Sequence, residues 1–413
     1  MSKRQPVRGT HDLLPDEYRR FAHVVETARD VARLYGYREM ATPIFEFTEL
    51  FARSIGETTD VVSKEMYTFN DRGNESLTLR PEYTAGICRA FISNGELAQQ
   101  LPLKVFAAGP MFRYERPQKG RQRQFHQIDV EVLGAPEPGA DIEVITLAAD
   151  ILERLGILDR CVLKLNSLGD PESRQAYRRV LYDYYCQHES RLSEDSRSRL
   201  QRNPLRILDS KDDGDKAVNA LAPSFTDHLN AASREFFTAV KGGLTAAGIP
   251  FEIDPALVRG LDYYTHTAFE FVTTHIGAQG TVLGGGRYDG LIEELGGPPT
   301  SGIGWAGGIE RLMMLANEPA PLPRPVVIAP LGAAAEAKVL GIARALRRAG
   351  IAVEQDYRGT MKRRLQRANK LKARAVVIIG DDELAKGVAQ VKDLDSGAQR
   401  EVALDRLAAA LDG

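Results

Sequence analysis

The sequence predicts an α+β fold in two parts: a large region built on an antiparallel sheet that carries a helical insertion, and a small C-terminal α/β domain. Short apolar runs typical of strands follow one another with few helices long enough to connect parallel strands, which favours antiparallel pairing. Residues 171–250 interrupt this pattern with charged residues and helix formers. A Pro-rich segment at 318–325 then precedes alternating β and α segments, which are typical of an α/β domain.

Length and composition exclude several classes of protein. The chain has 413 residues, 43% hydrophobic and 27% charged, and at roughly 150 residues per domain it predicts two or three domains. This composition is close to the globular average and unlike that of disordered chains. The three cysteines at 88, 161 and 186 match neither a disulfide framework nor the close pairs of a zinc site. With charges near the start and no apolar stretch approaching 18 residues, we expect a soluble, cytoplasmic protein that does not bind membranes.

The first part of the chain reads as a long helix followed by strands. Apolar residues from Tyr18 to Tyr35 recur at helical spacing, with Asp16 as the expected N-cap and Gly36 as the expected stop. A second helix is predicted at about 141–155. Strands are expected near residues 39–45, 66–69, 76–79, 104–108, 126–133, 160–166, 257–264 and 268–273.

The C-terminal part differs from the rest in charge as well as in pattern. From Arg324 onward there are 17 Lys and Arg against 11 Asp and Glu, a net charge of +6, so residues 1–323 carry −8. The two parts are therefore expected to face different partners. In the tail we predict helices at about 333–349 and 360–372, and strands at 326–329, 352–355 and 375–379.

One short string matches a dinucleotide-binding motif but lacks the neighbouring elements that this motif requires. Gly302 to Gly307 reads GxGxxG, but that motif belongs after the first strand of a βαβ unit. Here two prolines precede it and the Pro-rich segment follows. We interpret the match as accidental.

The stretch from Gly109 to Glu131 carries more chemical information. Two predicted strands flank a loop with five basic residues and one acid, Glu115. Guanidinium groups at a strand end form a natural phosphate clamp, although a solvated basic hairpin is the alternative. Near residue 308 a second arginine, Arg311, lies at the start of an apolar helix, where anions bind favourably.

These strings together resemble a known family. FRYER at 112–116, GIERL at 308–312 and Pro43 after an early helix resemble motifs 2, 3 and 1 of class II aminoacyl-tRNA synthetases. LVRGLDYYT at 257–265, GGRYDGL at 285–291 and TLRPEYT at 78–84 resemble segments of histidyl-tRNA synthetases. The resemblance implies a class II catalytic domain over 1–323, with 171–250 inserted in it, and an anticodon-binding domain over 324–413. It also implies a homodimer.

The resemblance further implies roles for individual residues in joining histidine to ATP and then to tRNA(His). Arg113 would bind the α-phosphate and Arg311 the γ-phosphate, with Glu115 also at ATP and Arg259 as an additional catalytic arginine. Mg²⁺ is expected with ATP, without assigned ligands. The implied histidine-binding residues are Glu82 and Thr84 at the amino group, Gln127 at the carboxylate, Glu131 and Tyr264 at the ring nitrogens, and Tyr263 and Tyr288 as walls.

Two regions are expected to bind tRNA. Arg116 and Gln118 lie in the loop implied to reach the acceptor end. The segment from Arg358 to Arg374 holds eight basic residues and no acid, which suits a phosphate backbone, and within it we assign Lys362, Arg363 and Arg367 to tRNA. The alternative for this segment is a merely solubilising helix.

Two other functions compete with a ligase. A non-catalytic paralogue, such as the regulatory subunit of ATP phosphoribosyltransferase, would share the sheet domain but lack the basic tail. A generic RNA-binding protein would explain the tail but not residues 78–131. Tyr83 stands where some family members carry a small residue, which bears on the local shape of the pocket.

Overall fold

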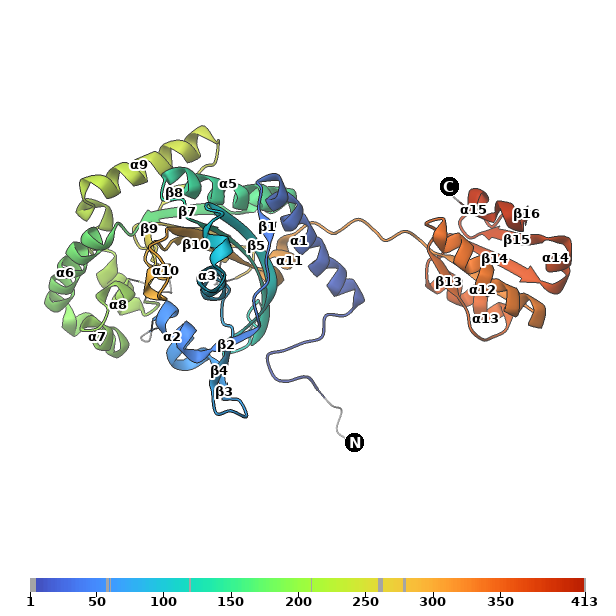
Figure 1. Ribbon diagram of the computed structural model, residues 1–413, viewed down its shortest axis with the longest axis horizontal. Coiled ribbons are helices and arrows are strands. Elements are labelled where there is room, and N and C mark those ends of the chain that lie inside the picture. Colours follow the sequence, from blue (N-terminus) through green and yellow to red (C-terminus); the bar gives the residue numbers. More distant parts are fainter. Residues whose placement is uncertain are drawn as a thin grey trace. The chain divides into compact units, whose positions relative to one another are not determined.

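We describe the protein from a computed structural model, drawn in Figure 1, which covers residues 5–56, 59, 61–118, 120–208, 210–258, 263–277 and 280–411. The chain divides into two compact units, Met1–Pro319 and Ala320–Gly413, and each is described by itself. Nothing in the described residues forms a helix both long and apolar enough to cross a membrane.

The first unit is built on an eight-stranded sheet in the order β1-β5-β6-β11-β10-β9-β7-β8. Its pairs are antiparallel except at the two edges, where β1 runs parallel to β5 and β8 to β7. This confirms the predicted antiparallel sheet. The strands are β1 (Arg38–Glu39), β5 (Leu103–Phe112), β6 (Gln124–Leu133), β7 (Val162–Ser167), β8 (Glu252–Ile253), β9 (Thr265–Val272), β10 (Thr281–Arg287) and β11 (Gly302–Gly308).

The sequence analysis missed two central strands and misplaced another. Strands β10 and β11 are rich in glycine, which has low strand propensity, and so they escaped detection. The strand predicted at 257–264 is wrong for Leu257, Val258, Tyr263 and Tyr264, which lie outside any strand; the residues between them are outside the described part. The GxGxxG string lies in β11, at the centre of an antiparallel sheet, which excludes the dinucleotide-binding arrangement.

Helices cover both faces of this sheet. On one face α1 (Pro15–Leu34), α5 (Pro138–Arg154), α9 (Ala231–Ala246) and α11 (Ile309–Leu315) pack in one apolar core with strand residues such as Ile128 and Val130. On the other face α3 (Thr84–Ser93) and α10 (Leu291–Glu294) join a second core. A short helix, α4 (Gly95–Ala98), connects α3 to β5, and a 3₁₀ turn, Leu158–Arg160, connects α5 to β7.

The predicted end of the first helix is confirmed and its predicted cap is wrong. Gly36 has a φ of +80° and follows the C-cap residue Tyr35, where glycine adopts the left-handed conformation without strain. The helix begins at Pro15, with Leu14 as N-cap, so Asp16 lies in the first turn. There its charge is favourable toward the helix dipole, which produces the same sequence signal as a cap.

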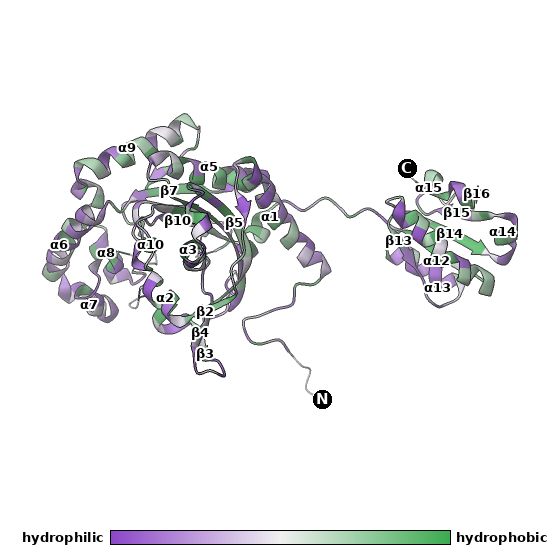
Figure 2. Ribbon diagram, in the orientation of Figure 1, coloured by the Kyte–Doolittle hydropathy of each residue, from purple (hydrophilic) through white to green (hydrophobic). Residues whose placement is uncertain are grey.

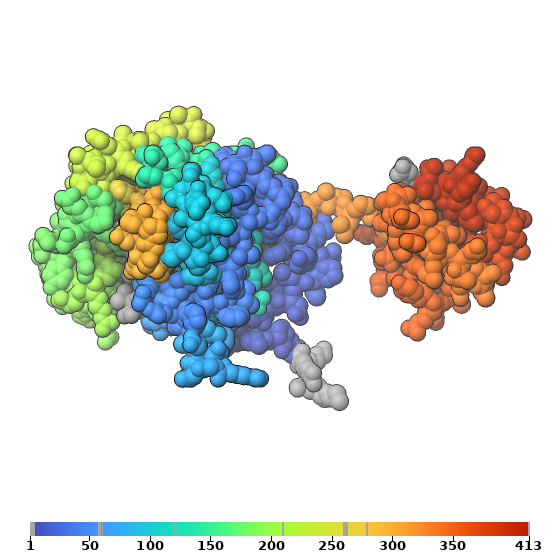
Figure 3. All heavy atoms as spheres, viewed as in Figure 1, coloured from blue at the N-terminus to red at the C-terminus, as the bar shows by residue number. Residues whose placement is uncertain are grey.

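A separate three-stranded sheet lies beside the large one. Its strand order is β2-β4-β3, and both pairs are antiparallel. Along the chain, α2 and a π-helical turn lie between β2 and β3. Figure 3 shows the segment near residue 70 projecting from the first unit. The elements are β2 (Phe45–Phe47), α2 (Thr48–Ile55), the turn Val61–Glu65, β3 (Tyr67–Asn70) and β4 (Ser76–Leu79).

The expected helical character of residues 171–250 is confirmed. Each of the four α-helices begins after a side chain that accepts a hydrogen bond from the first turn: Asp170, Ser193, Asp212 and Asn230. Such caps stabilise helices whose sequences are otherwise strongly polar, and Figure 2 shows the mixture of hydrophilic and hydrophobic residues along them. The elements before α9 are α6 (Pro171–Gln187), α7 (Glu194–Leu200), α8 (Asp213–Asn219) and the 3₁₀ turns Glu189–Arg191, Pro204–Ile207 and Phe225–His228.

The second unit is a small α/β domain with a five-stranded sheet in the order β13-β12-β14-β15-β16. The first three strands are parallel and the last two pairs antiparallel. The predicted elements are present, and β15, β16, α14 and α15 were missed. The elements are β12 (Val326–Leu331), α12 (Ala333–Arg348), β13 (Val353–Gln355), α13 (Met361–Lys370), β14 (Ala375–Gly380), α14 (Asp381–Lys386), β15 (Val388–Asp393), β16 (Gln399–Ala403), the turn Leu404–Arg406 and α15 (Leu407–Ala410).

A fully buried ion pair joins the end of β10 to α5. The side chains of Arg287 and Asp141 are both 0% exposed, and the guanidinium Nε donates to Asp141 Oδ2 at 3.1 Å. Arg287 also donates to the carbonyl of Ala135 at 3.1 Å and to Asp289 Oδ1 at 3.0 Å. Although it belongs to the GGRYDGL string, Arg287 therefore has a structural role.

We expect Arg287→Met to lower the free energy of unfolding by about 3–5 kcal/mol, because it leaves Asp141 buried without its partner. Denaturant unfolding of the purified protein measures this change. The control is Arg53→Met, which removes an exposed pair with Glu49 on α2 and is expected to cost less than about 1 kcal/mol. Equal effects of the two substitutions would contradict the role assigned to Arg287.

Candidate functional site

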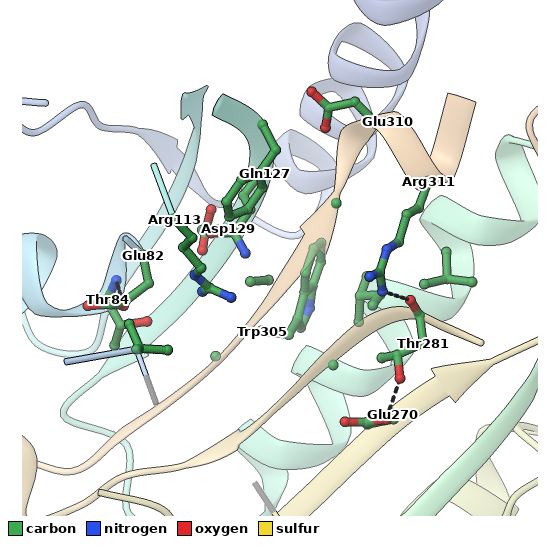
Figure 4. A pocket seen from close by; sticks show the side chains of 18 of the residues that line it. Glu82, Thr84, Arg113, Gln127, Asp129, Glu270, Thr281, Trp305, Glu310 and Arg311 are labelled. Carbon is green, nitrogen blue, oxygen red and sulfur yellow. Dashed lines mark hydrogen bonds between the residues drawn. The ribbon is translucent and has the colours of Figure 1, made fainter. Parts of the chain in front are cut away.

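A cavity of about 360 Å³ lies over the middle of the large sheet, lined by residues of β6, β9, β10, β11, α3 and α11 and by the loop between β5 and β6 (Figure 4). Strand β6 alternates across the sheet: Ile128 and Val130 enter the apolar core, whereas Gln127, Asp129 and Glu131 line the cavity. This follows from the period of two along a strand. A single strand thus supplies both the core and the floor of the site.

Small residues on β11 make room for the polar side chains of β6. Gly304 lies opposite Glu131 and Ala306 opposite Asp129. A Cβ atom on Gly304 would overlap the carboxylate of Glu131. Glycine is therefore required at this position by the close approach of a functional side chain, and this requirement explains the glycine content that hid the strand from sequence analysis.

Glu131 is the most closely held acid in the cavity. It is buried, its Oε1 accepts a hydrogen bond from Thr84 Oγ1 at 2.6 Å, and its Oε2 accepts one from the hydroxyl of Tyr288. Burial raises the pKa of Glu131 to about 8, against the opposing effect of these two hydrogen bonds. Tyr288 therefore orients the acid in addition to forming a wall, and its ring lies 5.7 Å from that of Tyr263.

Glu82 lies at the N-terminus of α3 and orders the segment that carries Thr84. Its carboxylate accepts hydrogen bonds from the backbone N–H of Thr84 at 2.6 Å and of Ala85 at 3.0 Å. Burial raises the pKa of Glu82, while these hydrogen bonds and the charge of Arg113 lower it. A carboxylate at this position also interacts favourably with the helix dipole.

Two arginines give the cavity positive charge, one near Glu82 and one on the far side (Figure 4). Arg113 follows β5, and its Nε donates to the carbonyl of Pro81 at 2.9 Å, which holds the guanidinium group toward the cavity (Figure 4). Arg311 on α11 donates to the carbonyl of Thr281 at 2.6 Å. Burial and the nearby charges of Arg121 and Arg113 lower the pKa of Arg311. An anion bound between these groups would relieve their mutual repulsion.

The acidic side chains near these arginines already have hydrogen-bond or ion-pair partners. Glu115 pairs with Arg121 at 2.8 Å, and Glu270 accepts from Thr281 Oγ1 at 2.7 Å. Glu310 accepts from the backbone N–H of His126 at 3.0 Å and so fastens α11 to β6. Within the described ranges, no group of three or more His, Cys, Asp or Glu could hold a metal ion by itself.

The helical insertion is joined by direct hydrogen bonds to the end of the cavity that holds Tyr264. Arg174 on α6 donates to the carbonyl of Tyr264 at 2.9 Å. The backbone N–H of His266, a residue with a φ of +43°, donates to the carbonyl of Gly169 at 2.7 Å, and its carbonyl accepts from Leu168 at 2.6 Å. Residues at the start of the insertion thus hold the segment that carries Tyr264 in place, in addition to its continuation into β9.

The structure brings together all the predicted ATP-binding and histidine-binding residues that it describes. They line the one cavity although they come from five separate segments of the sequence: Glu82, Thr84, Arg113, Glu115, Gln127, Glu131, Tyr263, Tyr264, Tyr288 and Arg311. Arg259 lies outside the described residues. Arg116 and Gln118 are exposed in the loop between β5 and β6.

Several lining residues were missed by the sequence analysis. Arg121, Glu270, Thr281 and Glu310 lie in the cavity wall. Arg121 belongs to the basic loop and Glu310 to the GIERL string, whereas Glu270 and Thr281 have no local signal. Asp129 could have been found, because it lies midway between two predicted residues on the same face of one strand.

The basic segment of the second unit is less uniformly exposed than its sequence suggests. Lys362 and Arg363 are exposed on α13. Arg364 is buried and donates to the carbonyl of Pro330. Arg367 pairs with Asp356 at 2.9 Å and with Glu354 at 3.3 Å. Acids from outside the segment thus compensate part of the charge.

The sequence and the fold both match known proteins. The family model described as histidyl-tRNA synthetase matches residues 9–312, and the model of an anticodon binding domain matches residues 325–413. The histidine–tRNA ligase of Rhodospirillum rubrum is 60% identical over 98% of this chain and 97% of its own length. That of Gluconacetobacter diazotrophicus is 58% identical over 100% and 99% of the two chains.

A solved structure agrees with these sequence matches. The crystal structure of apo S. aureus histidyl-tRNA synthetase superposes with a TM-score of 0.82 at 36% identity, covering 99% of this chain and 100% of that one. Similarity thus extends over both units and over every segment that lines the cavity. The chain belongs to the histidyl-tRNA synthetase family.

Proposed function

We propose that the chain is a histidine–tRNA ligase that activates histidine with ATP and transfers the histidyl group to tRNA(His). The observation that carries this proposal is the arrangement of charge in one cavity: buried carboxyl groups of Glu82 and Glu131 at one end, the guanidinium group of Arg311 at the other, and that of Arg113 between them (Figure 4). A zwitterionic amino acid with a basic ring suits the first end. A triphosphate suits the second.

In the first step the histidine carboxylate attacks the α-phosphorus of ATP, and pyrophosphate leaves as histidyl-adenylate forms. Both reactants are anions, so fixed cations must offset their repulsion in the transition state. Arg113, held by the Pro81 carbonyl, is our candidate at the α-phosphate, and Arg311 at the γ-phosphate, with Glu115 also at the nucleotide. Arg259 remains a predicted catalytic residue outside the described part.

The imidazole ring would lie between Glu131 and Tyr264, with Tyr263 and Tyr288 as walls. The pKa of Glu131 is about 8 in the empty cavity, and that of a free imidazole is about 6.5. At neutral pH Glu131 therefore holds a proton and the imidazole does not, so the two groups can share this one proton. Binding then places it between the carboxyl oxygen and a ring nitrogen. A ligand whose ring lacks a nitrogen would offer Glu131 no ring contact beyond its hydrogen bonds from Thr84 and Tyr288, which disfavours that ligand.

Mg²⁺ would arrive with ATP and neutralise phosphate charge when bound. The donor set fits this limited role: Glu115 and Glu270 line the cavity as single carboxylates, and the described residues form no cluster of metal ligands. Mg²⁺ commonly takes one or two carboxylates and completes its shell with phosphate oxygens and water.

The two rival functions have less support. A regulatory paralogue without the basic tail does not account for the match of residues 325–413 to an anticodon binding domain. A generic RNA-binding protein does not account for the buried acids of the cavity. We propose that the second unit binds the anticodon stem of tRNA through α13, that Arg116 and Gln118 reach the acceptor end, and that the protein acts in the cytoplasm.

We also propose a homodimer that forms through the three-stranded sheet. Phe45, Phe47 and Phe69 are 48%, 58% and 45% exposed on β2 and β3, close to Ile44 at 43%. Exposed apolar clusters of this kind mark interfaces, and two-fold symmetry is the commonest arrangement. Pro43, which resembles part of motif 1, immediately precedes this surface.

The proposed function predicts pyrophosphate exchange with histidine and with none of the other nineteen amino acids. The expected discrimination follows from buried polar partners that other side chains leave unpaired, which can reach about 10⁴–10⁵ in comparable sites. A panel of twenty amino acids measures it, with ATP-only samples as the control. Equal exchange with a second amino acid would show that the cavity does not specify histidine.

The dimer proposal predicts that Phe47→Glu yields a monomer, because the substitution places a charge in an apolar interface. Sedimentation at micromolar concentration would then give a mass near 45.5 kDa in place of twice that value. Leu221→Glu, which changes a residue 72% exposed in the insertion, should leave the mass unaltered. A Phe47→Glu protein of unchanged oligomeric state would place the interface elsewhere.

The tail proposal predicts that Lys362→Ala combined with Arg363→Ala weakens tRNA binding and flattens its salt dependence. Removing one cation that neutralises a phosphate should reduce the slope of log affinity against log salt by about 0.7–0.9. Arg367→Ala should do less, since its guanidinium group is paired with Asp356 and Glu354. Lys338→Ala combined with Arg344→Ala, both exposed on α12, is the charge-matched control, and an equal loss in that variant would remove α13 from the tRNA-binding surface.

A further inference from the structure

One buried carboxyl group in the cavity has no part in the reaction as described above. Asp129 lies on β6 between Gln127 and Glu131 and is 1% exposed. Its Oδ2 atom is buried and has no hydrogen-bond partner in the described part of the chain. Native proteins pair nearly all such atoms. An unpaired acceptor in a ligand cavity therefore points to a partner supplied by the ligand.

A second acceptor of the same kind lies two residues away. The side-chain Oε1 of Gln127 is also buried and without a hydrogen-bond partner among the described residues. Both side chains are on the cavity face of β6, where Figure 4 shows them near each other. Opposite them on β11 stand Gly308 and Ala306, which leave the space above these two acceptors open.

The nearby charged groups favour a cationic donor at this position. Glu82 and Glu131 are close enough to raise the pKa of Asp129 further, beyond the effect of burial, while Arg80 and Arg113 oppose them. Both arginines are fixed by other groups: Arg80 donates to the carbonyls of Thr42 and Pro110, each at 2.9 Å, and Arg113 to that of Pro81. Since Oδ2 of Asp129 takes no donor from the residues that the structure describes, a positively charged ligand group would complete the site.

The groups expected to hold the amino group of histidine are partly occupied. Both carboxylate oxygens of Glu82 accept backbone N–H groups at the start of α3, and the hydroxyl of Thr84 donates its proton to Glu131. A primary ammonium has three N–H donors. The two unpaired acceptors on β6 could accept two of them.

We propose that Asp129 binds the α-ammonium group of histidine, together with the amide oxygen of Gln127, whose NH2 group stays available for the histidine carboxylate, and is thus a further residue that determines substrate specificity. This inference rests on the proposed function, because it takes histidine as the ligand. It adds a charge-based requirement for a free amino group to the recognition of the ring by Glu131. The adenylate keeps this ammonium, so Asp129 would also retain the intermediate.

The test compares three ligands on the full-length protein and on Asp129→Asn, which keeps the shape of the side chain and removes its charge. Histidine carries ring, ammonium and carboxylate; histidinol lacks the carboxylate; imidazolepropionate lacks the ammonium. Asp129→Asn should weaken binding of the first two by about 10- to 100-fold, as expected for a hydrogen bond to a charged group, and leave the third unchanged in calorimetric titrations. Unchanged binding of histidine, or equal losses for all three ligands, would overturn the proposal.

A matched control and a stability measurement separate binding from folding. Asp150→Asn makes the same substitution outside the cavity, at a part-buried carboxyl group that accepts from the hydroxyl of Tyr35 at 2.5 Å, and should show no selective loss for the two ligands that carry an ammonium. Without ligand, Asp129→Asn should unfold at the same temperature as the unmodified protein or higher, because burial, Glu131 and Glu82 raise the pKa of Asp129 and favour its uncharged form, and its Oδ2 has no donor in the described part of the chain that the substitution would take away. A lower unfolding temperature, or failure to fold, would assign Asp129 a structural role and overturn the proposal.

The same measurements distinguish a failure of the role proposed for Asp129 from a failure of the proposed function. If the unmodified protein exchanges pyrophosphate with histidine while Asp129→Asn binds histidine as tightly, only the role of Asp129 fails. If the unmodified protein neither binds nor activates histidine, the proposed function fails and the role of Asp129 fails with it.

Discussion

Strand β6 imposes the constraint on which both the core and the cavity depend. Its residues alternate between Ile128 and Val130, which pack under the helices α1 and α5, and Gln127, Asp129 and Glu131, which face the cavity. Shifting the register by one residue would place three polar groups in the apolar core. The register is therefore strongly specified, and the positions of the acids follow from burial of their neighbours.

The cost of burying these acids explains the small residues and the hydroxyl groups around them. Glu131 has two donors from the chain, Thr84 and Tyr288, and needs Gly304 beside it because any side chain there would overlap its carboxylate. Buried carboxyl groups at one end of the cavity and Arg311 at the other, with Arg113 between them, give the cavity an internal polarity. Substrates with the opposite polarity are stabilised in one orientation, which is how charge placement can position the reacting groups.

The sequence by itself determined the features that depend on local spacing and on long motifs. Short apolar runs with few connecting helices predicted the antiparallel sheet, helical spacing before Gly36 predicted the first helix, and the alternating elements of the tail predicted the α/β domain. The strings around Arg113, Glu131 and Arg311 predicted residues that the fold brings to one cavity, because each string is read within a few residues of its functional side chain.

Only the tertiary structure decided the rest, since it depends on residues far apart in the chain. In the glycine-rich strands β10 and β11, neighbouring groups leave no room for a side chain at Gly285, Gly286 and Gly304, and strand propensity does not reflect such contacts between distant segments. The acids that pair with Arg367 lie 11 and 13 residues away, so the basic segment alone overstated its free charge. Asp129 acquired its significance from an atom without a partner among the described residues, and hydrogen-bond partners are fixed only when the strands have packed.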